Sequence, residues 1–197
     1  MFELIFATGN QHKFQEIKAI LPDSLQIKSF TDLNFTEDIP ETEDTLEGNA
    51  LLKARFIYDR YHLPCFADDS GLEVEALDGA PGVISSHYAG IDGASEVRAK
   101  ANMKKLLNEL SGKSNRKARF RTVIAYIDAK NNEHLFEGIV EGAIIETPVG
   151  TEGFGYDPVF VPDDYSITFA QMSLSEKNLL SHRARAFQKF VRFISFL

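Results

Sequence analysis

Apolar residues recur along the chain at two spacings, and this pattern predicts strands alternating with helices. A short apolar run over residues 4–7 predicts a buried strand, and a polar turn over 8–10 follows it. Apolar residues at helical spacing then predict a helix that stops before Pro22. A second apolar stripe predicts a helix over 45–61, although Gly48 is expected to weaken its first turn. The chain therefore opens with a strand, a glycine-containing turn and a helix.

The middle of the chain has a stronger strand pattern. Residues 65–67 and 72–76 are predicted to form two strands on either side of an acidic turn. A third amphipathic stripe predicts a helix over 95–110. Two β-rich runs, 119–129 and 134–145, are separated by a short polar segment, which is typical of an antiparallel hairpin.

The last part of the chain is predicted to be helical. Ser173 and Glu176 have the spacing of a capping box. On one continuous helix, Lys177 and His182 would diverge by about 140° and could not easily share a ligand. Ser181 is a good helix N-cap, so the helix is expected to break there if the two side chains act together. Because strands, helices and a hairpin are mixed, the predicted fold is α/β, with a mixed twisted sheet flanked by helices.

Composition limits the classes of function. The 197 residues, 44% of them hydrophobic and 25% charged, fit one large domain or two closely packed lobes. Cys65 is the single cysteine, which excludes an intramolecular disulfide, and its apolar neighbours predict a buried, inert thiol. The first residues lack a secretory signal and no apolar run of about 18 residues occurs, so we expect a soluble, cytoplasmic protein without membrane contact. The net charge of −8 argues against a protein that coats nucleic acid.

The adjacent carboxylates of Asp68 and Asp69 are the most informative candidate chemistry. Two explanations remain open on local sequence. The segment Asp68–Gly71 has ordinary turn composition, which is the commoner explanation. The alternative is a site for Mg²⁺ or a similar hard cation, because two carboxylates next to apolar residues would otherwise repel each other and resist burial.

Three further segments could recognise a phosphate ester or a base. The turn and helix start at residues 8–13 could receive an anion, or could be structural only. Lys53 could reach solvent or point into a cleft. The loop 153–158 combines two glycines with two aromatic residues, so it could form a wall for a base or simply bury its rings in the core. The cations near the last helix, Lys177, His182 and Arg183, could equally be solvated.

Taken together and in this order, these segments resemble the inosine triphosphate pyrophosphatase family, also called XTP/dITP diphosphatases. The resemblance spans nearly the whole chain. It rests on Thr8-Gly9-Asn10 with Lys13, Glu41 in an acidic loop over 37–44, Asp68-Asp69-Ser70-Gly71-Leu72, Gly79-Ala80-Pro81-Gly82, Gly153-Phe154-Gly155-Tyr156-Asp157-Pro158, Glu176-Lys177-Asn178 and Ser181-His182-Arg183.

The resemblance implies a function and a set of residue roles. It implies Mg²⁺-dependent hydrolysis of ITP, dITP and XTP to the monophosphate and pyrophosphate by a single domain, 1–197, with two lobes and a nucleotide cleft between them. It also implies a homodimer. Asp69 would be the proton acceptor, Glu41 and Asp69 would serve the metal, and Asp68 is a possible further ligand. The implied substrate-binding residues are Thr8, Gly9, Asn10, Gln11, His12, Lys13, Lys53, Ser70, Phe154, Gly155, Tyr156, Asp157, Lys177, His182 and Arg183.

One position departs from the family pattern, and two rival functions remain. His87 stands where bacterial members commonly have an arginine, so any phosphate or subunit contact there is in doubt. A nucleotide-binding sensor without turnover would keep the phosphate site but would not need the carboxylate of Asp69. An RNA-binding domain that uses the basic helix over 95–110 is disfavoured by the overall acidity.

Overall fold

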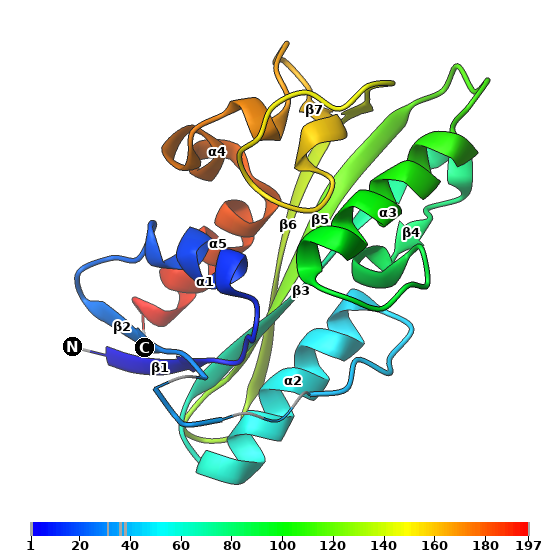
Figure 1. Cartoon of the computed structure of the whole chain (residues 1–197). Coiled ribbons are helices and arrows are strands. Elements are labelled where there is room, and N and C mark those ends of the chain that lie inside the picture. Colours follow the sequence, from blue (N-terminus) through cyan, green and yellow to red (C-terminus); the bar gives the residue numbers. More distant parts are fainter. Residues whose placement is uncertain (1, 31, 36, 38, 197) are drawn as a thin grey trace. The chain divides into compact units, whose positions relative to one another are not determined.

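The computed structural model describes residues 2–30, 32–35, 37 and 39–196, and it contains one seven-stranded mixed sheet (Figure 1). The strand order is β2-β1-β3-β5-β6-β7, and β4 pairs with β3. The strands are β1 (Phe2–Phe6), β2 (Leu25–Lys28), β3 (Cys65–Val74), β4 (Pro81–Gly82), β5 (Lys117–Ile127), β6 (Glu133–Ile144) and β7 (Phe160–Pro162). β1 is parallel to β2 and β3, whereas β4 is antiparallel to β3 and β7 to β6. The predicted mixed α/β sheet is confirmed.

The described residues form five α-helices beside the sheet, and the chain divides into two compact units. The helices are α1 (Gln11–Lys18), α2 (Leu46–Tyr61), α3 (Ser95–Glu109), α4 (Leu174–Leu180) and α5 (His182–Ile194). Unit 1 consists of Met1–Asp69, Thr122–Gly138 and Arg183–Leu197, and unit 2 of Ser70–Arg121 and Ile139–His182. Each unit has its own apolar core.

The core of unit 1 holds the end of β1 next to the beginning of β3. Phe6 is paired in register with Phe66, and the two rings stack with their centroids 4.5 Å apart. Phe190 of α5 packs against Phe66 at 5.1 Å. Because the two strands are parallel and β1 ends at Phe6, the chain after β1 leaves the sheet beside the first residues of β3, which continues to Val74. The turn that begins at Thr8 and the carboxylate of Asp68 therefore emerge side by side.

Unit 2 is built around the first part of β5 and the segments that cover it. Phe120 packs edge-on against Phe160 and parallel to Phe169, and Leu106 of α3 is buried in the same cluster. Tyr156 also enters this core, and its hydroxyl donates to the carbonyl of Ser85 at 2.9 Å. The core thus fixes the loop that contains Tyr156.

The predicted acidic turn between two strands is wrong, because Asp68 and Asp69 lie inside the continuous strand β3. Gly71 is not a turn glycine. A Cβ atom at this position would lie 2.4 Å from the carbonyl oxygen of Gly82, so glycine is needed for the close approach of β4. Pairing with a neighbouring strand overrides the local turn preference of the sequence.

Local caps define the start of α2 and of α4. Thr45 caps α2, and its hydroxyl oxygen accepts from the Gly48 N–H at 3.0 Å. Gly48 has a packing role, since a Cβ there would lie 2.7 Å from the Cβ of Glu43. Ser173 forms the predicted capping box of α4 with Glu176, and the chain is extended at Ser181 before α5 begins. The predicted break at Ser181 is confirmed.

Cys65 lies at the start of β3 and is fully buried, as predicted. Burial raises the pKa of its thiol to about 12, which makes thiolate chemistry unfavourable. No helix in the described part of the chain has the length and apolar character needed to cross a membrane.

The β5–β6 hairpin supplies a test of stability. Asp128 begins its turn, and the Asp128 carboxylate accepts from the N–H groups of Lys130 and Asn132 and from the Asn132 side chain at 2.8–2.9 Å. Burial opposes ionisation, but these hydrogen bonds outweigh it and lower the pKa of Asp128 to about 2. We expect Asp128→Ala to lower the free energy of unfolding by about 1–2 kcal/mol at pH 7 in denaturant titrations.

The pH dependence of that loss has a defined sign. Because the folded-state pKa is depressed, the stabilisation is present above the unfolded value of about 4 and is lost as the pH falls toward about 2. The difference between wild type and Asp128→Ala should therefore shrink over this range. Glu152→Ala, which removes an exposed loop carboxylate, is the control and should have little effect. An undiminished difference at pH 2 would contradict this account.

Candidate functional site

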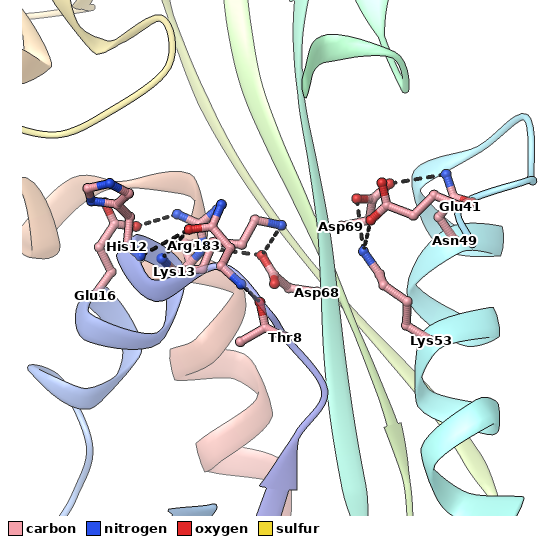
Figure 2. A network of polar contacts seen from close by, with 11 residues as sticks. Thr8, His12, Lys13, Glu16, Glu41, Asn49, Lys53, Asp68, Asp69 and Arg183 are labelled. Carbon is pink, nitrogen blue, oxygen red and sulfur yellow. Dashed lines mark hydrogen bonds and ion pairs between the residues drawn. The ribbon is translucent and has the colours of Figure 1, made fainter. Parts of the chain in front are cut away.

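Asp69 is the centre of a charged group in unit 1 (Figure 2). The Lys53 ammonium lies 3.2 Å from Asp69 Oδ1 and 2.5 Å from Glu41 Oε1. The side-chain amide of Asn49 donates to Asp69 Oδ2 at 3.4 Å. Two carboxylates thus share one ammonium ion, and the structure places Glu41 and Asp69, both predicted site residues, around Lys53.

Helix α2 supplies both donors to Asp69. Asn49 and Lys53 are four residues apart and therefore lie on the same face of the helix, beside the buried stripe that contains Ala50 and Ala54. Both side chains are buried, so they point toward β3 instead of solvent. Of the two orientations open for Lys53 from sequence, the inward one is correct.

The charges in this group are unequally stabilised. Burial raises the pKa of Asp69, and the nearby Lys53 ammonium only partly offsets the effect. For Glu41, burial is outweighed by the Lys53 charge, and the pKa is lowered. Burial lowers the pKa of Lys53, but Asp69 and Glu41 outweigh it and the net shift is upward. Lys53 therefore stays protonated, and Asp69 is the more basic carboxylate.

The Glu41 and Asp69 carboxylates fit a hard divalent cation. They already share one cation in the form of the Lys53 ammonium, and the Glu41 side chain is 31% exposed, so the group is accessible from solvent. Among the described residues no set of three or more His, Cys, Asp or Glu side chains is arranged to hold a metal. Two carboxylates suit Mg²⁺, which retains several waters and takes further ligands from phosphate groups. Asp38 of the predicted acidic loop lies outside the described residues.

Asp68 has a different set of partners on the other side of β3 (Figure 2). Successive side chains of a strand point to opposite faces, so Asp68 faces away from Asp69. The Lys13 ammonium and the Arg183 Nε each lie 3.1 Å from Asp68 Oδ2. Glu16 accepts from the other side of the Arg183 guanidinium. The network of Lys13, Glu16, Asp68 and Arg183 is hereafter called the Asp68 network.

Three members of the Asp68 network have shifted pKa values, and the shifts differ in direction. Burial opposes ionisation of Asp68, but the charges of Lys13 and Arg183 outweigh it and the pKa is well below its usual range. The pKa of Arg183 is raised by Glu16 and Asp68 against the effect of burial. Burial lowers the pKa of Lys13, and Asp68 offsets only part of this change. Lys13 is thus the cation with the most to gain from an additional anion.

The turn before α1 is organised by Asn10. Its side-chain oxygen accepts from the N–H groups of His12 and Lys13 at 3.0 and 3.2 Å, and the Asn10 N–H donates to Thr8 Oγ1 at 3.2 Å. An anion that uses the same two N–H groups must replace the Asn10 oxygen. Three residues of this segment are exposed: Gly9, Gln11 and His12.

Unit 2 contains a second charged group, centred on Asp157. The Lys177 ammonium lies 2.6 Å from Asp157 Oδ2, and the Phe154 N–H donates to the same oxygen at 2.8 Å. The ammonium also lies over the rings of Phe154 and Phe169, 5.1 and 5.4 Å from their centroids. Lys177 and Asp157 are 3% and 2% exposed, so the alternative of a solvated surface lysine is wrong.

His182 and Tyr156 are likewise fixed within unit 2. The His182 imidazole is buried and stacks on Phe120, with a centroid distance of 4.6 Å and an interplanar angle of 9°. The Tyr156 ring lies in the core, as the second explanation of its loop proposed. Phe154 and Gly155 are partly exposed, and Ser70 is half-buried on β3. Arg183 is buried in unit 1, so neither His182 nor Arg183 is a solvated cation.

Sequence reasoning missed three residues that support these groups: Glu16, Asn49 and Phe120. Two of them had a detectable signal. Glu16 follows Lys13 by three residues on α1, and Asn49 precedes Lys53 by four on α2, so each shares a helix face with a predicted site residue. Phe120 had no such signal, because only the folded chain brings it to His182.

His87, where the sequence departs from the family pattern, is exposed, and its Nδ1 lies 2.7 Å from Ser86 Oγ. No charged partner of His87 is found among the described residues. His87 is therefore not a member of the Asp69 group, the Asp68 network or the Asp157 group.

Comparison with known proteins identifies the family. Residues 4–193 match the Ham1 family. A dITP/XTP pyrophosphatase of Porphyromonas gingivalis is 54% identical over 187 residues, covering 94% of each chain. One from Flavobacterium psychrophilum is 49% identical over 191 residues, 97% of this chain and 98% of the relative. The Ham1 protein structure from Coxiella burnetii covers all of both chains with a TM-score of 0.89 and 35% identity, and that from Staphylococcus aureus covers 98% of both with a TM-score of 0.86 and 37% identity. The chain therefore belongs to the Ham1 family.

Proposed function

We propose that this chain hydrolyses the deaminated purine nucleotides dITP, XTP and ITP to the monophosphate and pyrophosphate, with Mg²⁺ as cofactor. Relatives that match nearly the full length carry the name dITP/XTP pyrophosphatase. The observation that carries the proposal is the buried Asp69 carboxylate, which shares one ammonium with Glu41 and has a raised pKa. A nucleotide sensor has no need of such a base.

The cations of unit 1 receive the triphosphate. Lys13 and Lys53 each have an ammonium held by carboxylates, and the turn over 8–13 adds backbone donors and the positive end of α1. Arg183 is held on both sides by Asp68 and Glu16, which supports a role in holding Asp68 and Lys13 in place.

Glu41 and Asp69 would hold the metal ion, and Asp68 would not. The separate partners of Asp68, which neutralise its charge, support this division. Bound at Glu41 and Asp69, Mg²⁺ would supply positive charge to the phosphate oxygens.

Asp69 accepts the proton of the attacking water. The water oxygen forms a bond to the α-phosphorus. The bond between that phosphorus and the oxygen that bridges the α- and β-phosphates breaks, and pyrophosphate leaves with the bridging oxygen. The raised pKa supports this assignment, because a base accepts a proton more readily as its pKa approaches the working pH.

The charged group of unit 2 recognises the base. Lys177 is a buried donor held by Asp157, and a donor directed at the 6-oxo group of hypoxanthine or xanthine would be left unpaired by the 6-amino group of adenine. Phe154 and Gly155 form the accessible part of the loop. His182 and Ser70 are the other residues proposed to bind the nucleotide. Tyr156 contributes through its backbone, because its ring is in the core.

The remaining assignments follow from the family resemblance. We propose that residues 1–197 act as a single domain, that the protein is a homodimer, and that it works in the cytoplasm on free nucleotides. The overall acidity, with a net charge of −8, supports a small-molecule substrate over nucleic acid.

A substrate panel tests the proposed function. Purified protein is given dITP, XTP, ITP, GTP and ATP with Mg²⁺, and the phosphate products are identified by ³¹P nuclear magnetic resonance. We expect pyrophosphate from the first three nucleotides and slow turnover of ATP and GTP. Release of orthophosphate, or equal rates with ATP and dITP, would contradict the proposal.

Asp69→Asn separates the hydrolase from the sensor. Asparagine keeps the volume and an oxygen for Lys53 but cannot accept the proton, so kcat for dITP should fall about 100-fold or more while nucleotide binding persists. Asp59→Asn, on the exposed face of α2, is the matched control and should retain activity. An active Asp69→Asn protein would favour the sensor.

Lys53→Met tests the shared ammonium. The substitution leaves Glu41 and Asp69 without their common cation, so in the absence of metal the free energy of unfolding should fall by about 2 kcal/mol. Mg²⁺ should restore more stability to this variant than to wild type, as measured by the melting temperature. Arg55→Met removes an exposed ion pair from the same helix, so it should cost less than about 1 kcal/mol and respond to Mg²⁺ as wild type does. Equal responses to Mg²⁺ in all three proteins would exclude a metal at Glu41 and Asp69.

A further inference from the structure

Asn49 connects the strand that carries Asp69 with the segment that carries Glu41, the two proposed metal-binding carboxylates. It is 2% exposed on α2 (Figure 2). Its side-chain amide pairs with the backbone of Glu43, since Oδ1 accepts from the Glu43 N–H at 3.0 Å and Nδ2 donates to the Glu43 carbonyl at 3.3 Å. Nδ2 also donates to Asp69 Oδ2 at 3.4 Å. One buried amide thus contacts both the segment that carries Glu41 and the strand that carries Asp69.

The chemistry of these contacts requires an amide. A primary amide has two N–H donors and one carbonyl acceptor, and Asn49 uses both kinds of group. Aspartate has no N–H to donate to Asp69 and would add a negative charge beside it. An apolar side chain would suit the buried face of α2 equally well, but it would leave Asp69 without this donor.

Asn49 and Lys53 together determine how the Asp69 carboxylate is oriented. Lys53 contacts Oδ1 and Asn49 contacts Oδ2, so each oxygen has one donor from the same helix. The two donors differ in kind, because the Lys53 ammonium sits on a flexible stem whereas the Asn49 amide is anchored to the Glu43 backbone. The rigid partner is therefore Asn49.

The same amide also fixes Glu41. Glu41 lies two residues before Glu43, on a segment that is largely exposed. The paired hydrogen bonds to Glu43 tie this segment to α2, where Lys53 contacts the Glu41 carboxylate. Without them, only the ion pair with Lys53 connects the Glu41 carboxylate to the helix among the contacts of the described residues.

We propose that Asn49 is a positioning residue for the metal site, which orients the Asp69 carboxylate and holds the Glu41 segment beside it. The proposal rests on the proposed function, because it takes Glu41 and Asp69 to be the metal ligands. Asn49 touches neither the metal nor the nucleotide in this assignment. Its loss should therefore weaken metal binding and lower kcat, and leave KM for the nucleotide nearly unchanged.

The test measures metal binding without nucleotide. Mn²⁺ alone is titrated into wild type, Asn49→Ala and Asn49→Leu by calorimetry, and the Mg²⁺ dependence of dITP hydrolysis is measured in parallel. Residues that orient metal ligands typically contribute 10- to 100-fold to metal affinity or activity. We expect at least a 10-fold weaker Mn²⁺ affinity and, with dITP at saturating Mg²⁺, a kcat at least 10-fold lower and a KM within about 2-fold of wild type.

Two choices keep the test decisive if stability changes. Asn49→Leu keeps most of the side-chain volume. Glu43 is an exposed residue, so water can replace the Asn49 amide as the partner of its backbone groups, and this variant should fold. Asn102→Ala is the matched control in unit 2: Asn102 is also a buried asparagine, and it bonds to the backbone of Ser85, Ser86 and Ala89. It should lower the melting temperature without changing Mn²⁺ affinity.

The outcomes separate this inference from the proposed function. Asn49 variants that are folded and bind Mn²⁺ as tightly as wild type would overturn the positioning role, even if wild type hydrolyses dITP. An equal loss of Mn²⁺ affinity in Asn102→Ala would also overturn it, since the effect would then be one of general stability. A wild type that binds Mn²⁺ but releases no pyrophosphate would overturn the proposed function and leave the metal-binding result for Asn49 to stand on its own.

Discussion

The alternation of side chains along β3 is the constraint on which the charged groups of unit 1 depend. Asp68 and Asp69 are adjacent in sequence, yet a strand directs them to opposite faces, so each contacts different cations. Asp68 is neutralised by Lys13 and Arg183, and its pKa is lowered. Asp69 has Lys53, shared with Glu41, and its pKa is raised. A turn at this position would have placed both carboxylates in one solvated loop, where neither pKa shift would arise.

Much of this arrangement was predictable where the signal is local. The cap at Thr45, the capping box at Ser173 and the break at Ser181 depend on the hydrogen bonds of a few neighbouring residues, and the sequence contains all of them. The strand at Asp68 was not predictable in this way. Its conformation depends on the approach of Gly82 to Gly71, and turn propensity cannot report a contact between backbone atoms of different segments.

The candidate site was predictable to a similar extent. The motifs indicated candidate site residues, but not which of them are buried. Lys177 looks like a surface lysine on α4, and only the fold brings Asp157, Phe154 and Phe169 around its ammonium. Residues that support the site are harder to predict from sequence. An asparagine such as Asn49 has no distinctive spacing from Glu43, whose backbone it binds. Polar residues beside the apolar stripe of a helix, one turn from a predicted site residue, are the nearest available signal.

The charge balance of unit 1 explains why a metal ion should accompany the substrate. The cations Lys13, Lys53 and Arg183 face four carboxylates, those of Glu16, Glu41, Asp68 and Asp69, so the combined group carries a net negative charge when all are ionised. A triphosphate alone would be repelled by such a group, and in a partly buried site this repulsion is weakly screened. Under the proposed function, a divalent cation would reverse the sign of the group and make the approach of the triphosphate favourable. The carboxylates would then bind the metal, and the lysines would keep them ionised and in place before it binds.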